Sequence, residues 1–386
     1  MARLQSPKQQ ALLEKFFQML KIMADKKGTD LFITTGMQPC MKLNGELVQL
    51  APTALTPDMA KDMVFGIMDE AQEQEFIEHR ECNFALSASG IGRFRVSAFY
   101  QRNQVGMVLR RIEFQVPRLE DLDLPPIISK LAMEKRGLIL FVGATGTGKS
   151  TSLAAMIQYR NENSRGHIIC IEDPIEFIHQ HKKSIVTQRE VGIDTESFEV
   201  ALKNTLRQSP NVIMIGEVRS KETMEYALAF AETGHLCLAT LHANNANQAL
   251  ERVINFFPQE RHNQIWMDLS LNLRSVIAQQ LVPTPDGKAR KGVIEVLLNT
   301  PLVSDMIRRG DVHGLKEIMT KSRELGMQTF DQALYDLYAA NQINYEDAIA
   351  HADAPNDLRL MIKLGSSASG AEARFGASVD QFTLLD

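Results

Sequence analysis

The chain has 386 residues, of which 44% are hydrophobic and 23% charged, and its formal net charge is -5 at pH 7. Single cores stop growing near ~250–300 residues, so we expect at least two domains. The acidic balance argues against binding to nucleic acid through a basic field. The isolated cysteines argue against a zinc site or a disulfide framework. Without a signal peptide or an apolar run near ~18 residues, we expect a soluble, intracellular chain that does not insert into membranes.

The amino-terminal part mixes helical and strand-like patterns. Apolar residues at helical spacing between Leu12 and Met23 predict an amphipathic helix with one buried face. Alternating apolar segments on either side of Asn44-Gly45 predict a β-hairpin. Residues 57–80 have a helical pattern, and residues 83–112 alternate like strands. We therefore expect an α/β domain with an antiparallel sheet over residues 1–115.

A different pattern begins after residues 116–126, a charged, proline-containing segment that we interpret as a linker. Over residues 127–364, helical segments alternate with the apolar runs GLILFVGA, HIICIE, NVIMIGE and LCLATLHA. Runs that are apolar on both faces predict buried parallel strands in a sheet covered by helices. From about Pro301 helical patterns predominate. Residues 365–386 are rich in Gly, Ala and Ser, and we predict a disordered tail.

The stretch GATGTGKST matches the phosphate-loop pattern G-x-x-x-x-G-K-[ST], between a predicted strand and a predicted helix. Glycines let backbone N–H groups surround phosphate oxygens, and the helix N-terminus adds its positive dipole end. A lysine there reaches the β- and γ-phosphates, and the following hydroxyl ligates Mg²⁺. A chance glycine-rich turn would match in roughly one such chain in a hundred. We therefore predict ATP and Mg²⁺ binding by Gly143, Ala144, Thr145, Gly146, Thr147, Gly148, Lys149, Ser150 and Thr151.

Carboxylates follow two of the predicted strands. CIEDPIEF contains three acids, the last being Glu176, and NVIMIGEVRS contains Glu217. Beside a phosphate loop, such acids hold Mg²⁺ through water or orient the attacking water. A solvated turn is the alternative interpretation for the first cluster.

Two histidines, His235 and His242, bracket the apolar run LCLATL. They are candidates for sensing the γ-phosphate, although a lone histidine is more often structural. Seven residues of strand span roughly 23 Å, which argues against a shared metal ion.

A series of motifs in this order resembles those of type IV pilus retraction ATPases, the PilT/PilU family of secretion ATPases: GRFRVSAF, GATGTGKSTSLAAM, IEDPIEFIH, VTQREVG, GEVRSKET, AETGHLCLATLHA and LGMQTFDQAL. The resemblance covers about residues 10–350. It implies a PAS-like N-terminal α/β domain followed by a RecA-like P-loop ATPase domain with a helical C-terminal region. The implied assembly is a homo-hexamer. The implied activity is ATP hydrolysis that powers or assists pilus retraction, and hence twitching motility.

The resemblance also assigns roles to individual residues. Glu176 becomes the base or water-positioning residue, and Glu217 becomes the Walker B acid that holds Mg²⁺ with Ser150. His235 and His242 form the family's His box.

The remaining candidates implied by the resemblance are Arg93, Arg95 and Arg110. They match arginines of the first domain that reach nucleotide phosphates when the domains close. A guanidinium can neutralise charge developing on the γ-phosphate, whereas a solvated basic face is the alternative from the residues alone. The implied partners are a PilT-type retraction ATPase and the inner-membrane pilus platform protein. The implied location is the cytoplasmic face of the inner membrane.

Departures from the family pattern favour the PilU branch, the accessory retraction ATPases. PLVSDMIRRG replaces the AIRNLIRE-like helix of the retraction motors, and Asn211 replaces an Asp before the Walker B strand. A PilT-type main motor is one alternative. Another is a nucleotide-gated scaffold that docks on a second motor and hydrolyses little ATP itself. A nucleic-acid translocase is disfavoured by the acidic net charge.

Overall fold

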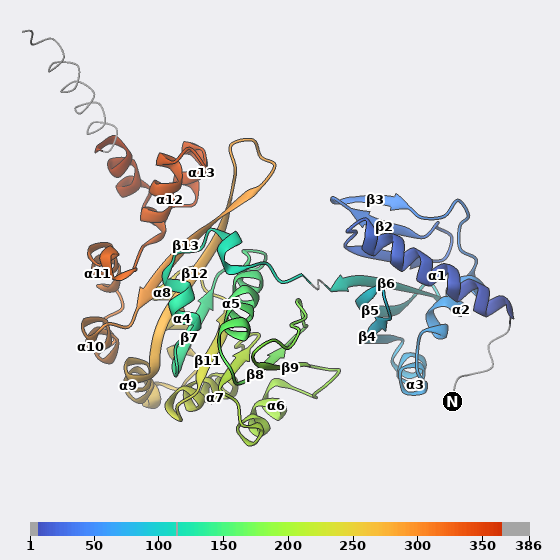
Figure 1. Ribbon diagram of the computed structural model, residues 1–386, viewed down its shortest axis with the longest axis horizontal. Coiled ribbons are helices and arrows are strands. Elements are labelled where there is room, and N and C mark those ends of the chain that lie inside the picture. Colours follow the sequence, from blue (N-terminus) through green and yellow to red (C-terminus); the bar gives the residue numbers. More distant parts are fainter. Residues whose placement is uncertain (1–6, 113–114, 365–386) are drawn as a thin grey trace, which may run out of the picture. The chain divides into compact units, whose positions relative to one another are not determined.

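The computed structural model describes residues 7–112 and 115–364, and the chain divides into two compact units (Figure 1). The first unit comprises Met1–Gln115 with Ile175–Ile178, and the second comprises Val116–Pro174 with His179–Asp386. The predicted tail, residues 365–386, lies outside the described residues. Within the described ranges, no helix combines the length and the apolar character needed to cross a membrane.

The first unit is an α/β sheet structure with the strand order β3-β2-β1-β6-β5-β4, and all of its pairings are antiparallel. Its elements are α1 (Pro7–Asp25), β1 (Asp30–Thr34), β2 (Cys40–Leu43), β3 (Glu46–Gln49), α2 (Pro57–Gly66), α3 (Glu70–His79), β4 (Glu81–Ala88), β5 (Gly92–Gln101) and β6 (Gln104–Ile112).

Local sequence explains most of these elements. In α1, Phe16, Leu20 and Met23 are fully buried, which confirms the predicted apolar face. The β2–β3 hairpin is also confirmed, because Asn44 and Gly45 both have positive φ, as a two-residue turn requires. The helical stretch predicted over residues 57–80 is two helices rather than one. It breaks before Asp69, which caps α3 in a reciprocal pair with Gln72.

The second unit holds the predicted parallel sheet and a helical C-terminal region. Its elements are η1 (Leu119–Leu122), α4 (Ile127–Ala132), β7 (Gly137–Val142), α5 (Lys149–Asn163), β8 (His167–Glu172), β9 (Ile185–Glu190), α6 (Phe198–Thr205), η2 (Leu206–Gln208), β10 (Val212–Ile215), α7 (Lys221–Glu232), β11 (Leu236–Leu241), α8 (Ala246–Asn255), η3 (Gln259–Arg261), α9 (His262–Asn272), β12 (Leu273–Pro283), β13 (Arg290–Leu298), α10 (Pro301–Arg309), α11 (Leu315–Lys321), η4 (Arg323–Leu325), α12 (Phe330–Ala339) and α13 (Tyr345–Ala350).

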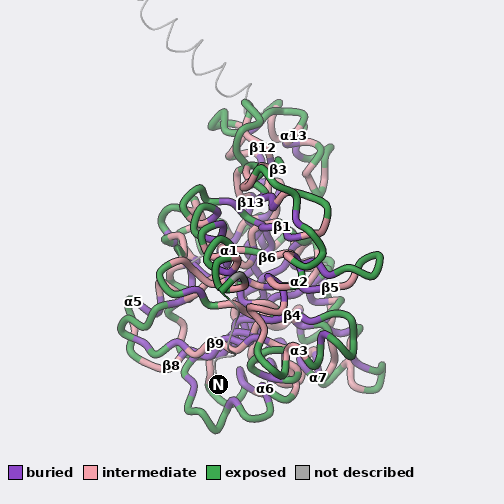
Figure 2. Tube along the Cα trace, turned by 90° about the vertical axis from the view of Figure 1, so that its right-hand side faces the viewer, coloured by how far each residue is buried: buried purple, intermediate pink, exposed green. Residues whose placement is uncertain are grey.

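The sheet of this unit has the order β13-β12-β7-β11-β10-β8-β9, and only the β12–β13 pairing is antiparallel. Alternate residues of β7 face opposite sides. Leu138 and Leu140 pack in one core with α6 to α13, whereas Ile139 and Phe141 pack in another with α4 and α5. Covered on both faces, the central strands β7 and β11 are buried throughout. Figure 2 colours the buried residues of the chain purple.

The α/β fold class with a P-loop domain is thus confirmed, as are the parallel strands at the four apolar runs. β9, β12 and β13 were not predicted from the sequence. Antiparallel β13 is an addition to the parallel strands that we expected.

Candidate active site

Glycines shape the loop between β7 and α5. Gly143, Gly146 and Gly148 have φ angles of 152°, 79° and 87°, a region that other residues rarely adopt. A Cβ on Gly143 would lie 2.4 Å from the backbone oxygen of Gln279. One on Gly148 would lie 2.8 Å from the side-chain nitrogen, Nε2, of Gln279. A Cβ on Gly146 would meet nothing within 4 Å. The loop therefore packs tightly against β12 at both ends and is open at its tip.

Gln279, on β12, packs against this loop and was not predicted as a site residue from the sequence. Its side chain is buried, and its Oε1 accepts a 2.8 Å hydrogen bond from Ser152 Oγ in α5. Because the amide group also lies against Gly148, one side chain links the loop, the helix that follows it and the neighbouring strand.

Lys149 lies in the first turn of α5, with its ammonium group directed back at the loop. Its Nζ donates hydrogen bonds of 2.7 Å to the carbonyl oxygens of both Gly143 and Ala144. Ser150 and Thr151 follow in the same turn and are partly exposed. The first N–H groups of a helix point out of its N-terminus, where the dipole favours anions. This geometry suits phosphate oxygens at the loop.

Glu217 follows β10, at the sheet edge that carries the loop. Its carboxylate lies 2.7 Å from Arg219 Nη2 and 3.0 Å from His242 Nε2. Burial acts to raise its pKa. The Arg219 hydrogen bond and the charges of His242, Arg219 and Lys149 outweigh this and hold the pKa below its ordinary value. Glu217 is therefore ionised at neutral pH. Arg219 also lies 3.6 Å from Asp173, so it bridges the acids of two strands.

Arg219 was not predicted as a site residue, although its position two residues after Glu217 places it at the same strand end. Its guanidinium group lies close to both carboxylates, those of Asp173 and Glu217.

The two predicted histidines lie at opposite ends of β11. His242 follows the strand and meets Glu217, whereas His235 precedes it. The His235 ring lies 3.1 Å from Thr233 Oγ1 and 3.3 Å from the Phe230 carbonyl oxygen. At ~3.3 Å per residue, the strand between the two histidines is about 20 Å long. This unit thus brings only His242 to the acids, and the role of His235 stays a prediction.

The acid cluster that follows β8 is divided between the two units. Glu172 ends the strand, and its Oε1 accepts a 2.9 Å hydrogen bond from Gln188 of β9. Glu176 belongs to Ile175–Ile178, the short segment that groups with the first unit. Its role as base or water-positioning residue therefore stays a prediction.

The three predicted arginines share one face of the first unit's sheet. Arg95 and Arg110 are direct cross-strand partners, and Arg93 alternates with the buried Phe94. Arg110 is 73% exposed, and its Nε donates a 2.8 Å hydrogen bond to the buried carboxylate of Asp30. Arg95 and Arg110 thus lie away from the core, whereas the Nε of Arg93 is buried. The role of all three toward a nucleotide stays a prediction.

A cavity of about 540 Å³ lies beside the phosphate loop, within the usual size range of small-molecule sites. It is lined by residues 143–145, by residues 242–244 and by Gln248, Glu251, Arg252 and Asn255. The lining brings together the loop, the turn that contains His242 and the exposed face of α8.

The donor set fits Mg²⁺ that is bound together with a nucleotide. Among the described residues, no group of three or more His, Cys, Asp or Glu could hold a metal ion alone. Mg²⁺ typically keeps several waters and binds through one or two protein oxygens plus substrate phosphates. The Ser150 hydroxyl beside the loop and the ionised Glu217 are donors of this kind.

Comparisons with known proteins agree with this geometry. Residues 80–326 match the family model described as type II/IV secretion system protein. The structure of the pilus retraction motor PilT with bound ADP aligns with a TM-score of 0.83 and 38% identity, covering 88% of this chain and 98% of that one.

Two curated relatives come from Pseudomonas aeruginosa. The type IV pilus ATPase PilU is 70% identical over 352 residues, which are 91% of this chain and 92% of the relative. The retraction ATPase PilT is 37% identical over 340 residues, 88% of this chain and 98% of the relative. The chain therefore belongs to the type II/IV secretion system protein family, within the PilT/PilU group of ATPases.

Proposed function

We propose that this chain is a PilU-type ATPase that couples ATP hydrolysis to type IV pilus retraction. One observation carries the proposal: the phosphate loop, the ionised Glu217 and His242 lie together at one edge of the sheet. The 70% identity to PilU and the likeness to ADP-bound PilT support the activity and its use in retraction.

In this proposal each group of residues has a separate role in ATP hydrolysis. The N–H groups of residues 143–151 and the ammonium group of Lys149 bind the phosphates. Ser150 and Glu217 would hold Mg²⁺ directly or through water, and Mg²⁺ would supply positive charge that offsets the charge of the phosphates. Glu176 orients or deprotonates the attacking water, and His242, which contacts Glu217, reports the state of the γ-phosphate.

We infer a homo-hexamer that works with a PilT-type ATPase at the pilus platform protein, on the cytoplasmic face of the inner membrane. The domain limits that we propose are 1–115, a linker over 116–126, an ATPase domain over 127–364 and a tail over 365–386. The names of the relatives support the pilus assignment.

Phosphate release by the purified full chain, with ATP and Mg²⁺, tests the function. Lys149→Ala should lower the rate about a hundredfold or more, because a charge-assisted phosphate contact is lost. Lys130→Ala, an exposed lysine on α4, is the matched control and should keep the wild-type rate. Near-normal hydrolysis by a folded Lys149→Ala protein would contradict the nucleotide site. A wild-type chain that binds nucleotide but releases no phosphate would favour the scaffold alternative.

A further inference from the structure

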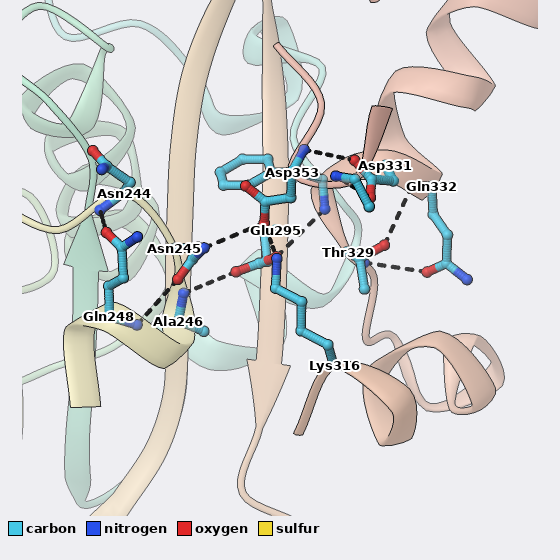
Figure 3. A network of polar contacts seen from close by, with 12 residues as sticks. Asn244, Asn245, Ala246, Gln248, Glu295, Lys316, Thr329, Asp331, Gln332 and Asp353 are labelled. Carbon is cyan, nitrogen blue, oxygen red and sulfur yellow. Dashed lines mark hydrogen bonds and ion pairs between the residues drawn. The ribbon is translucent and has the colours of Figure 1, made fainter. Parts of the chain in front are cut away.

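One buried carboxylate joins two helices of the second unit. Glu295, on β13, is fully buried. Its Oε1 accepts a 2.8 Å hydrogen bond from the Ala246 amide, and its Oε2 accepts one of 3.4 Å from the Phe330 amide (Figure 3). These amides belong to the first residues of α8 and α12. The first N–H groups of a helix lack hydrogen-bond partners within the helix, so Glu295 supplies an acceptor at the start of each of the two helices.

Charged residues from the C-terminal region complete the network. Lys316 of α11 places its Nζ 3.8 Å from Glu295 Oε2 and also pairs with Asp353. Asp353 accepts a 3.3 Å hydrogen bond from the side chain of Asn245, the N-cap of α8. The amide of Asp353 donates to Asp331 of α12 at 2.9 Å. Polar contacts through Glu295 and Asp353 thus link the start of α8 to the C-terminal helices.

The same end of α8 forms part of the candidate active site. The turn of residues 242–244 leads directly into its N-cap, and Gln248 and Arg252 on its exposed face line the cavity beside the phosphate loop. Asn245 Oδ1 accepts from the Gln248 amide at 3.0 Å, and Gln248 Oε1 accepts from the Asn244 amide at 3.2 Å. These short-range bonds fix the turn of residues 242–244 to the start of α8. A displacement of the helix start should therefore also displace His242.

We propose that Glu295 is a positioning residue for ATP hydrolysis, which sets α8 and His242 against the phosphate loop according to the placement of α11 and α12. The inference rests on the proposed function, and Glu295 itself lies outside the cavity lining. It makes Glu295 the link between the C-terminal helices and the site, so a change that weakens α12 but keeps the bond from the Ala246 amide to Glu295 should leave turnover intact. A carboxylate that only stabilised the fold would leave turnover by the folded protein unchanged.

Glu295→Gln is the decisive substitution, because it keeps the shape of the side chain. The amide retains one accepting oxygen, but its NH₂ group only donates, so one of the two helix starts loses its acceptor. Thr329→Ala is the matched control. It removes the cap that Thr329 Oγ1 provides to the Gln332 amide at 3.3 Å and weakens the start of α12, while the Glu295 bond to Ala246 remains.

The experiment measures kcat, KM for ATP, Kd for a fluorescent ADP with Mg²⁺, and Tm on the full chain. Glu295→Gln should lower kcat about tenfold, with KM and Kd changed less than about threefold, because misplacement affects chemistry more than binding. Thr329→Ala should lower Tm to a similar extent and keep kcat within about twofold.

Equal kcat losses in the two variants, or an unchanged kcat in Glu295→Gln, would overturn the inference while leaving the proposed function intact. A wild-type chain without turnover would contradict the proposed function and this inference with it. If Glu295→Gln does not fold, Lys316→Met provides the second test from the partly exposed side of the network. It should lower kcat about threefold at unchanged Kd, and an unchanged kcat would refute the positioning role.

Discussion

Glu217 is an ionised carboxylate of the candidate active site. Its contacts with Arg219 and His242 keep the carboxylate ionised, which a ligand of hydrated Mg²⁺ requires. Glu217→Gln removes the charge at nearly constant volume. We expect the Mg²⁺ concentration for half-maximal ATPase activity to rise about tenfold and the maximal rate to fall. A Mg²⁺ titration of steady-state hydrolysis measures both, and an unchanged half-maximal concentration would remove Glu217 from the Mg²⁺ site.

Glu176→Gln should behave differently if Glu176 orients or deprotonates water. The variant should bind a fluorescent ADP with Mg²⁺ as tightly as the wild type does, while kcat falls about a hundredfold or more. The pair of variants thus separates a ligand of the ion from a residue of the chemical step. Weaker nucleotide binding with an unaltered rate per bound nucleotide would make the role of Glu176 structural.

His179 gives the second unit a measurable sensitivity to acid. Its ring is buried, with its amide bonded to Gln188 and its Nδ1 donating to Gln158 at 3.2 Å. Burial lowers its pKa from 6.5 to about 4. The unfolded chain therefore takes up a proton near pH 6.5 that the folded chain refuses until about pH 4, so stability falls as the pH drops through this window.

The loss from this single group should reach about 2 kcal/mol at pH 5. Urea unfolding at pH 7 and pH 5 measures it, and His179→Gln, which cannot be protonated, should reduce the difference by about that amount. If the variant and the wild type lose the same stability between these pH values, His179 is not the sensitive group.

At the scale of elements, β12 determines the shape of the phosphate loop through Gln279. Gln279→Ala leaves the buried Ser152 hydroxyl without its acceptor and opens space beside Gly148. We expect a loss of about 2–4 kcal/mol in unfolding free energy and weaker ADP binding. Gln280→Ala is the control, since that side chain bonds to the His351 carbonyl and alternates to the other face of the strand. Equal effects on ADP binding in both variants would mean that β12 acts only through stability.

The elements that could be predicted are those whose signals are local. The loop, its flanking strand and helix, and Glu217 follow from short motifs and from apolar runs that a doubly covered sheet requires. β9, with the sequence IVTQRE, is short and largely polar, and β12 carries polar residues within its apolar run, so neither gave a clear periodicity.

The rest of the site depends on contacts between distant segments. Gln279 reaches the loop only because β12 pairs with β7, and Glu295 reaches Ala246 only because β13 pairs with β12. No spacing in the sequence indicates such neighbours. Sequence thus predicted the residues that touch the nucleotide in our proposal, and the fold was needed to find those that hold them in place.

At the scale of the whole molecule, the family pattern predicts a closed ring. A head-to-tail interface closes when its rotation divides a full turn, and it can then place one subunit's residues at its neighbour's site. Light scattering coupled to gel filtration, with ADP and Mg²⁺, should give a mass about six times the 43.3 kDa of one chain. A monomer at all protein and nucleotide concentrations would contradict the hexamer.

The arginines of the first unit test whether the two units act together in such a ring. Arg95 and Arg110 lie side by side on the face of the sheet opposite its core. If that face meets a nucleotide only on closure, the guanidinium groups stabilise charge in the transition state and contribute little to binding. Arg95→Ala should then lower kcat about a hundredfold, with the Kd for ADP changed less than about threefold.

Two comparisons make that measurement specific. Arg110→Ala should show the same division between rate and affinity, together with a lower Tm, because the buried Asp30 keeps the bond from the Thr29 hydroxyl but loses its charged donor. Lys61→Ala removes a positive charge from α2, whose apolar residues pack on the core side of the sheet, and should leave the rate unchanged. If Lys61→Ala slows hydrolysis as much as Arg95→Ala, the effect is one of net charge. If Arg95→Ala weakens ADP binding while preserving the rate per bound nucleotide, the arginines bind the ground state, and closure of the units is not what drives the chemical step.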